Sequence, residues 1–177
     1  MKRAIVALLL VLPLSAFAQG YVGIGFGQTT ADYPDCSIST TCDDTDTGFK
    51  IFGGYRFNQS FAVEGGYADF GESTFSISGF GSGTLDANTL FVHAVGIIPI
   101  NPQWFVYGKA GLHMWDASES GEILGAPFSV SDDGTDPTFG FGVQGNFGQF
   151  GLRLEWETYD LGNVDFQFLG VSGIVRF

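Results

Sequence analysis

Apolar residues alternate with polar residues or glycine along most of this chain, and this period of two constrains the fold more than any other feature of the sequence. The clearest stretch places Phe49, Ile51 and Tyr55 on one face and Lys50 and Arg56 on the other. Successive side chains of a β-strand point to opposite faces of its sheet, whereas one face of a helix repeats every three to four residues. The helical spacing is nearly absent, so the sequence predicts an all-β protein.

The alternation predicts eight strands, with each boundary defined to about two to four residues. They begin near Gly20, Gly48, Phe61, Ala87, Trp104, Thr138, Phe150 and Phe166. Short turns are expected at 58–60, 101–103 and 148–149, long loops at 30–47, 71–86 and 116–137, and a shorter connection at 160–163. An even number of strands, with short turns at one end and long loops at the other, is typical of an outer-membrane barrel.

The composition excludes several other classes of protein. A length of 177 residues fits one domain. The formal net charge is -12 with 7 Lys and Arg, so the basic stripe that a nucleic-acid-binding surface needs is missing. A hydrophobic content of 45% argues against disorder. No uninterrupted run of about 18 apolar residues occurs, so a membrane-spanning helix is not expected.

The first 18 residues have the three parts of a secretory signal peptide. Lys2 and Arg3 form a positive n-region, residues 4–14 form an apolar h-region, and Ala-Phe-Ala at 16–18 matches an A-x-A cleavage site. We therefore expect export, cleavage, and a single outer-membrane β-barrel domain over residues 19–177. Removing Lys2 and Arg3 leaves 5 cations against 19 acidic residues, which gives a mature net charge of -14.

Alternation alone does not say which face of a barrel is apolar. A soluble eight-stranded lipocalin also alternates, with its apolar face inward. Three features favour a transmembrane barrel, and aromatic residues beside the short turns are the first. The second is that all 5 cations after residue 18 fall within predicted strands, on the less apolar face, while most acidic residues lie in or beside the long connections. The third is the aromatic last residue, Phe177.

The aromatic residues predict a girdle at each membrane interface. The girdle beside the short turns comprises Phe57, Phe61, Trp104, Phe147 and Phe150. The girdle nearer the long loops comprises Tyr67, Trp115, Phe139, Trp156 and Tyr159.

Several short motifs, taken in order, resemble the OmpA-like outer-membrane barrel family. They are Phe-Gly-Gly-Tyr-Arg-Phe at 52–57, Val-Glu-Gly-Gly-Tyr at 63–67, Gly-Lys-Ala-Gly at 108–111, Trp-Asp at 115–116, Asp-Pro-Thr at 136–138 and Arg-Leu-Glu-Trp at 153–156. The resemblance spans residues 19–177 and implies an eight-stranded antiparallel up-and-down transmembrane β-barrel. It implies that Phe177 is a signal for the barrel-assembly machinery. It also implies an interior charge cluster, whose positions Glu64, Lys109 and Arg153 match.

The less apolar face predicts a polar and ionic cluster in the barrel lumen. Its members are Lys50, Arg56, Glu64, His93, Lys109, His113, Gln144, Arg153, Glu155 and Glu157. Side chains just fill an eight-stranded barrel, so these charges would neutralise one another in a packed plug. A narrow ion path lined by charge is the alternative. The two histidines also allow a pH-sensitive switch, which we favour less.

The long loops suggest one covalent link and one surface property. Cys36 and Cys42 are the 2 cysteines of the chain, and an exported chain meets an oxidising compartment, so we expect a disulfide that shapes the first loop. The first and third loops are rich in Asp and Glu, which predicts a solvated acidic surface. Divalent cations bridging this surface to lipopolysaccharide phosphates are the alternative. No cofactor and no dedicated metal site are expected.

Three functions remain open. The favoured one is a monomeric structural or surface-presenting protein of a Gram-negative outer membrane, in contact with lipid and lipopolysaccharide, which supports envelope integrity or adheres to host or surface ligands through its acidic loops. A small, low-conductance porin-like channel is the alternative. A lipid-modifying enzyme is a remote third: Ser118 and Ser120 follow His113, but no nucleophile elbow or oxyanion-hole signal accompanies them.

Overall fold

The computed structural model describes residues 19–32, 40–43, 45–77, 81–123, 126–162 and 164–177. The predicted signal peptide and Cys36 lie outside these ranges, so cleavage and the disulfide to Cys42 stay predictions. The strands of the described residues are β1 (Gly20–Asp32), β2 (Thr40–Asp43), β3 (Thr45–Arg56), β4 (Phe61–Ile77), β5 (Gly81–Pro99), β6 (Trp104–Ile123), β7 (Ala126–Phe147), β8 (Phe150–Asp160) and β9 (Asp165–Arg176). Within the described ranges there is no helix of the length and hydropathy needed to cross a membrane.

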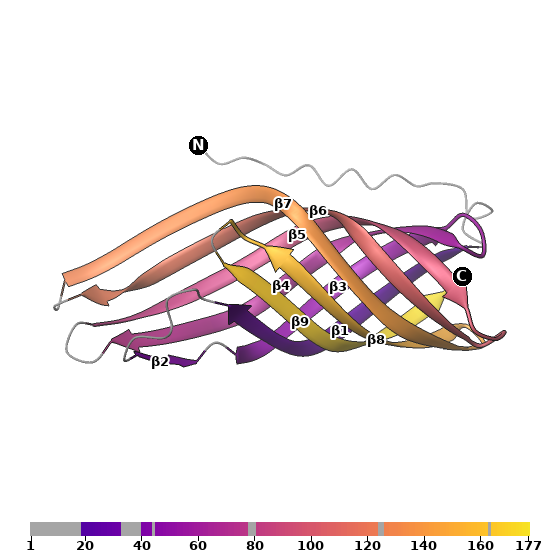
Figure 1. The fold of residues 1–177 in the computed structure, drawn as a ribbon, viewed down its shortest axis with the longest axis horizontal. Helices are drawn as coiled ribbons and strands as arrows, with labels where there is room; N and C mark the ends of the chain where they lie inside the picture. Colours follow the sequence, from indigo (N-terminus) through magenta and orange to yellow (C-terminus); the bar gives the residue numbers. More distant parts are fainter. Residues whose placement is uncertain (1–18, 33–39, 44, 78–80, 124–125, 163) are drawn as a thin grey trace.

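Eight of these strands close into one antiparallel barrel (Figure 1). β1 pairs with β3 on one side and with β9 on the other, so the first and last strands are neighbours. The order continues through β8, β7, β6 and β5 to β4, which also pairs with β3 and completes the circle. The short β2 pairs with residues 74–77 of β4. The eight-stranded up-and-down barrel predicted from the alternation is confirmed. Closure gives backbone N–H and C=O groups the partners that lipid does not offer.

Two of the predicted long loops are β-hairpins. Residues 71–77 continue β4, and β6 and β7 stay paired to Ile123 and Ala126, far beyond the strands next to them. The predicted starts of β5 at Ala87 and of β7 at Thr138 are therefore wrong. The prediction relied on an apolar face, which a strand needs only where it meets lipid or a core. Much of the hairpin sequence beyond the barrel wall is Ser, Thr, Gly and acidic residues, which signal a strand only weakly.

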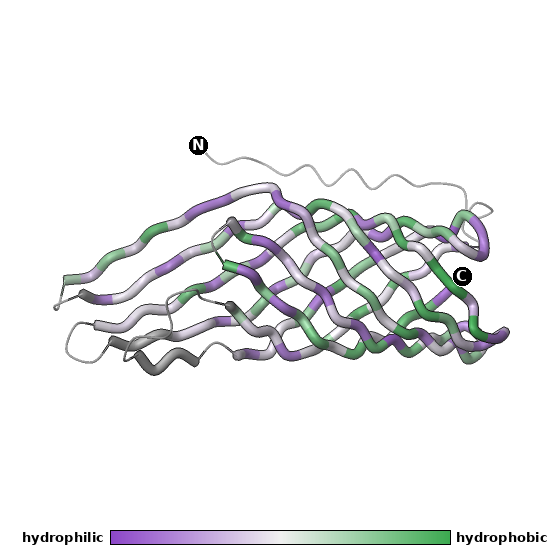
Figure 2. The backbone as a smooth tube through the Cα atoms, viewed as in Figure 1, coloured by the Kyte–Doolittle hydropathy of each residue, from purple (hydrophilic) through white to green (hydrophobic). Residues whose placement is uncertain are grey.

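The outer surface of the barrel is a band of apolar side chains. It includes Val22, Ile24, Phe26, Ile51, Leu90, Val92, Leu112, Met114, Phe141, Leu152, Leu154, Leu169 and Val171, all exposed. Apolar and polar residues alternate along the barrel strands in Figure 2. Such a continuous apolar band indicates a lipid-facing surface.

The girdle beside the short turns lies on this outer surface. Phe57, Phe61, Trp104, Phe147 and Phe150 are all exposed, and the Trp104 ring packs edge-on against Phe147 with centroids 6.0 Å apart. At the other end Phe139 is exposed, and Tyr67 and Trp156 are half-buried on the outside.

Trp115 and Tyr159 do not belong to a girdle, and this part of the prediction is wrong. They are 6% and 0% exposed and lie in the lumen. The reason is the alternation itself. Trp115 shares the inward face of β6 with His113, and Tyr159 shares the inward face of β8 with Glu157. The lumen is therefore richer in aromatic residues than the sequence suggested.

Candidate functional site

Six charged side chains form a neutral layer across the middle of the lumen. Three cations, Lys50, Lys109 and Arg153, face three carboxylates, Glu64, Glu155 and Glu157, and each of the six is at most 2% exposed, Lys109 (4%) excepted. We call this set the ionic layer. Its members come from β3, β4, β6 and β8, so the ion pairs cross the lumen and join opposite walls of the barrel.

The ion pairs of this layer are short and share partners. The Lys50 ammonium lies 2.8 Å from Glu155 Oε1 and 2.5 Å from Glu157 Oε2. The Lys109 ammonium lies 2.7 Å from Glu155 Oε2 and also contacts Glu157. Arg153 Nη2 donates to Glu64 Oε1 at 2.7 Å. Neighbouring pairs therefore form one network rather than separate bridges.

Neutral groups complete the coordination of the carboxylates. Tyr21 donates its hydroxyl proton to Glu64 Oε1 at 2.7 Å. Tyr107 and Ser172 donate to the two oxygens of Glu155, at 3.0 Å and 2.7 Å. Arg153 Nε donates to the Gln144 side-chain oxygen at 3.0 Å. The two tyrosines and Ser172 are not among the predicted lumen residues, although all three lie at inward positions of the alternation.

An aromatic layer lies next to the ionic layer, toward the hairpins. Its rings belong to Phe70, Phe91, Trp115, Tyr159, Phe166 and Phe168, each no more than 6% exposed. Phe70 contacts both Phe166 and Tyr159, with ring centroids 5.0 Å and 4.9 Å apart. The side chains of the two layers lie in the lumen and are almost inaccessible to water.

The two histidines belong to this aromatic layer and form no ion pair with a described residue. His93 stacks on Phe91 at 4.7 Å, and its Nε2 is 3.4 Å from the Thr138 hydroxyl. His113 Nδ1 lies 2.9 Å from the Thr89 hydroxyl, and its Nε2 lies 2.9 Å from the Asp160 carbonyl oxygen. Both rings are held by fixed polar partners.

Inward glycines make room for these rings. Gly23 pairs directly with Phe52, Gly54 with Tyr21, Gly142 with Tyr107 and Gly134 with Trp115. A Cβ atom on any of the four glycines would lie closer than 3.0 Å to the ring of its partner. Each of these four rings therefore lies over a glycine of the neighbouring strand. The rings occupy the lumen space that the glycines, which have no side chain, leave free.

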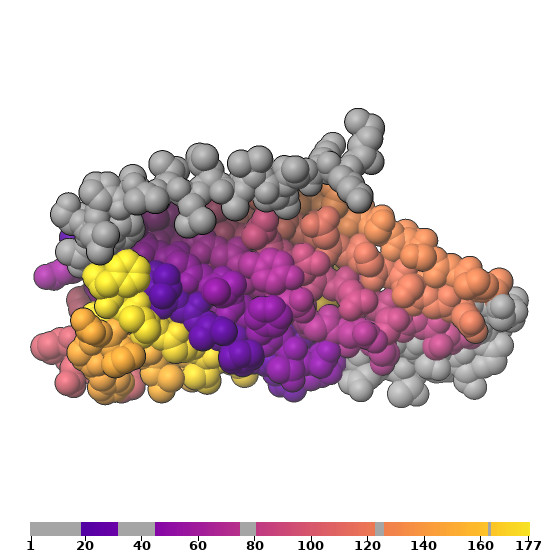
Figure 3. All heavy atoms as spheres, turned by 180° about the vertical axis from the view of Figure 1, so that it is seen from behind, coloured from indigo at the N-terminus to yellow at the C-terminus, as the bar shows by residue number. Residues whose placement is uncertain are grey.

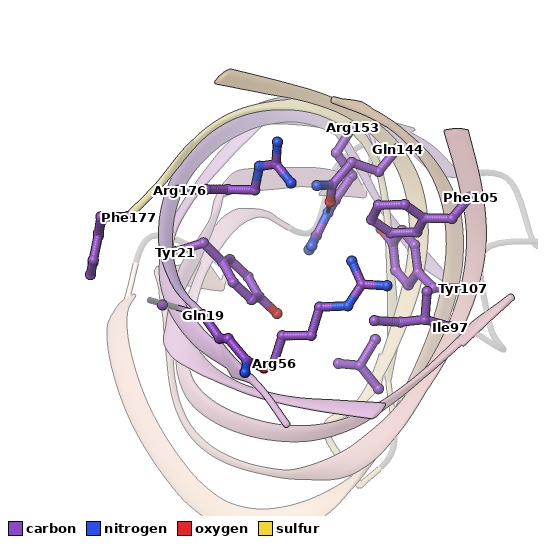
Figure 4. Close-up of a pocket in the computed structure, with 12 residues that line it drawn as sticks. Gln19, Tyr21, Arg56, Ile97, Phe105, Tyr107, Gln144, Arg153, Arg176 and Phe177 are labelled. Atoms are coloured by element: carbon purple, nitrogen blue, oxygen red, sulfur yellow. Dashed lines mark hydrogen bonds between the residues drawn. The ribbon is translucent and has the colours of Figure 1, made fainter. Parts of the chain in front are cut away.

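A cavity of about 160 Å³ lies beyond the ionic layer, at the end of the barrel with the short turns (Figure 4). Arg56 faces this cavity and does not join the ion pairs of the predicted cluster. Its Nε and Nη2 donate to the carbonyl oxygens of Asn58 and Gln59 at 3.0 Å and 2.7 Å. Arg56 lies at the end of β3, and it forms no ion pair with an Asp or Glu side chain of the described residues.

Among the described residues, no three His, Cys, Asp or Glu side chains converge on a point that could hold a metal ion. Of the acidic residues of the predicted first loop, Asp35 and Asp44 lie outside the described ranges. The arrangement of the described lumen therefore supports a packed, charge-balanced plug.

Known proteins share this architecture. The family model described as "Outer membrane protein beta-barrel domain" matches residues 4–177. A crystal structure of Ail, the attachment invasion locus protein of Yersinia pestis, is similar at a TM-score of 0.64 and 22% identity, covering 90% of this chain and 99% of that chain. A second Ail structure, in complex with the heparin analogue sucrose octasulfate, is similar at a TM-score of 0.63 and 20% identity, covering 90% and 98%.

Neisserial surface protein A is similar at a TM-score of 0.64 and 17% identity, covering 89% of this chain and 97% of that chain. These identities establish likeness of fold. A search of curated proteins finds no match.

Proposed function

Because this chain belongs to the outer membrane protein β-barrel domain family, we propose that it is an integral outer-membrane protein that works through its protruding hairpins, by surface presentation and adhesion. The observation that carries this proposal is the length of β6 and β7, which contain 20 and 22 residues. A transmembrane strand needs about 9–11 residues. The excess corresponds to roughly 30 Å of paired strand outside the membrane.

The β6–β7 extension, defined as residues 116–136, projects beyond the barrel at the end away from the C-terminus (Figures 1 and 3). It carries six acidic residues and no Lys or Arg; they are Asp116, Glu119, Glu122, Asp132, Asp133 and Asp136. Strand pairing holds these charges in place, so binding costs less entropy than it would in a loop that must order. Such a hairpin suits recognition of a partner outside the cell.

The sign of the charge limits the partner. One Ail structure contains sucrose octasulfate, a polyanion. The acidic extension of this chain would repel such a ligand, so we propose a neutral or cationic surface as its partner. We also propose that divalent cations bridge the acidic surface to lipopolysaccharide. In the same proposal the barrel-assembly machinery recognises Phe177, and the protein is a monomer.

The filled lumen favours this role over the channel alternative. The ionic layer and the aromatic layer both cross the lumen, and their charged members are almost fully buried. A catalytic role is likewise no part of the proposal. Ser118 is five residues from His113 along β6, about 16 Å, and on the opposite face of the strand. His113 is already bonded to Thr89 and to the Asp160 carbonyl.

Excision of the hairpin tip tests the proposal. Residues 118–131 are replaced by Asn-Gly, a two-residue turn that suits the antiparallel register of Ala117 and Asp132. We expect attachment of cells carrying this variant to cationic or host-cell surfaces to fall to the level of cells without the protein, while heat-modifiable gel mobility is retained. A matched control replaces residues 76–82 at the tip of the β4–β5 hairpin. Undiminished attachment by both variants would contradict the proposal.

A further inference from the structure

Every arginine after residue 3 lines the same cavity. Arg56, Arg153 and Arg176 come from β3, β8 and β9, and they converge on the 160 Å³ space at the short-turn end of the barrel (Figure 4). We call this space the arginine pocket. Three guanidinium groups in one small cavity repel one another unless an anion lies among them.

Only one of the three guanidinium groups is paired with an Asp or Glu side chain of the described residues. Arg153 is paired with Glu64. Arg56 and Arg176 donate to backbone carbonyls of the short turns, at Asn58, Gln59 and Gly148, and form no ion pair with a described Asp or Glu side chain. No Asp or Glu side chain lines the pocket. Among the side chains that line the pocket, no acidic group therefore offsets Arg56 and Arg176.

Two buried donors of these arginines lack a hydrogen-bond acceptor. They are Nη1 of Arg153, a residue that is 2% exposed, and Nε of Arg176. Arg153 Nη1 lies 3.8 Å from Glu155 Oε2, which is within ion-pair range but too far for a hydrogen bond. A buried donor without a partner is unfavourable, and such groups in native structures usually have a ligand, ion or water to bind. The polar side of the pocket is thus equipped to receive an acceptor.

The opposite wall of the pocket is apolar. It is formed by Val95, Ile97 and Phe105, with Phe105 also stacked under the Arg56 guanidinium at 5.2 Å. A ligand in this pocket would place its charge toward the arginines and any hydrocarbon part against Ile97 and Phe105. The stacking also fixes the direction of Arg56 without neutralising it.

The short turns of outer-membrane barrels face the periplasm. We infer that the arginine pocket, which lies at the short-turn end, binds a phosphate group presented from that side of the membrane. Two guanidinium groups without a paired Asp or Glu side chain suit a phosphate monoester, which carries a charge of about -1.5 to -2 at neutral pH. Guanidinium forks fit phosphate oxygens bidentately. The volume suits one such group with a small substituent, because a cavity of about 150 Å³ holds a molecule the size of benzene.

The test uses the barrel purified in a non-ionic detergent and titrated calorimetrically with inorganic phosphate and with phenyl phosphate at constant ionic strength. We expect saturable binding of both, and tighter binding of phenyl phosphate because its ring can contact Phe105. Arg56→Gln and Arg176→Gln should each weaken binding about tenfold, since each removes hydrogen bonds to a charged group. Gln103→Ala, in an exposed turn at the same end, should bind as the unaltered protein does.

Retained gel mobility on heating shows which variants fold. Arg56→Lys and Arg176→Lys keep the charge but lose the fork, so they should bind severalfold more weakly, and they replace the Gln variants if those do not fold. The phosphate group could belong to a lipid headgroup or to a soluble compound, and nanodiscs with and without phosphatidic acid distinguish the two. If phosphatidic acid weakens the binding of phenyl phosphate, the pocket binds a headgroup. If phosphatidic acid does not compete, the pocket binds a soluble phosphate compound. Two results would overturn the inference. One is a heat of phosphate titration no larger than that of a chloride titration. The other is that the Arg56 and Arg176 variants bind phosphate as tightly as the unaltered protein.

Discussion

At the scale of single residues, the lumen depends on glycines that lie under aromatic rings. Gly23 is the clearest case, because its Cβ would lie 2.8 Å and 2.9 Å from the two Cε atoms of Phe52. We expect Gly23→Ala to lower the free energy of unfolding by about 1–3 kcal/mol, the usual range for overpacking. Urea titration of the barrel refolded in lipid vesicles measures this.

Gly53→Ala is the matched control on the same pair of strands. Its Cβ would point outward, with its nearest neighbours at 3.7 Å and 3.8 Å, which is ordinary contact. The control should differ from the unaltered protein by less than about 0.5 kcal/mol. Equal effects of the two substitutions would show that crowding by the Phe52 ring is not the cause.

The ionic layer makes a second prediction at this scale. Lys109 faces Glu155 and Glu157 with no exposure to water for its side chain. Lys109→Met should destabilise the barrel by about 3–5 kcal/mol, because it leaves buried carboxylates uncompensated. Adding Glu157→Gln restores the charge balance and should recover part of the loss. A double variant less stable than Lys109→Met would contradict the role of charge balance.

At the scale of elements, β4 contains a bulge where its hairpin leaves the barrel wall. The register with β5 shifts between Asp69 and Glu72, and Gly71 has a φ of +76°. Asp46 of β3 fastens this point, since its carboxylate accepts the backbone N–H of Glu72 at 2.7 Å and of Thr47 at 2.6 Å. These two backbone hydrogen bonds lower the pKa of Asp46.

The lowered pKa predicts how the bulge responds to acid. A carboxylate whose pKa is lower in the folded state stabilises the fold above its unfolded pKa, and this contribution is lost as the pH falls through the folded pKa. The backbone amide of Glu72 should therefore lose protection against hydrogen exchange below about pH 4. NMR measures this as the ratio of its exchange rate to the intrinsic rate of an unprotected amide at the same pH. Asp46→Asn should remove this pH dependence. A pH profile that is the same in both proteins would contradict the assignment.

The elements also show how far the sequence leads. Alternation predicts the strands inside the barrel wall, because each has one face in lipid and one in the lumen. It misses the extensions of β6 and β7, whose described residues 118–122 and 126–131 are exposed or half-buried. Trp115 and Tyr159 are predicted to lie in a girdle because they are aromatic. The alternation places them in the lumen, because they share a strand face with His113 and Glu157. The partners within the ionic layer depend on the stagger of strands that lie far apart in sequence, such as β4 and β8, and no local pattern encodes that stagger.

At the scale of the whole molecule, charge is sorted along the barrel axis. The β6–β7 extension is acidic, the ionic layer is neutral, and the arginine pocket is positive. The aromatic layer separates the extension from the ionic layer. This arrangement fits the proposed binding through the hairpins, with the lumen as a stabilising plug. The filled lumen is the central claim, since an open path would restore the channel alternative.

Single-channel recording in planar bilayers tests this claim most directly. The refolded barrel should show no discrete conductance steps above the bare bilayer, because the ionic and aromatic layers fill the lumen. Arg153→Ala, which removes one member of the ionic layer, serves as the comparison. Reproducible, ion-selective steps from the unaltered protein, with a size that changes in Arg153→Ala, would contradict the account.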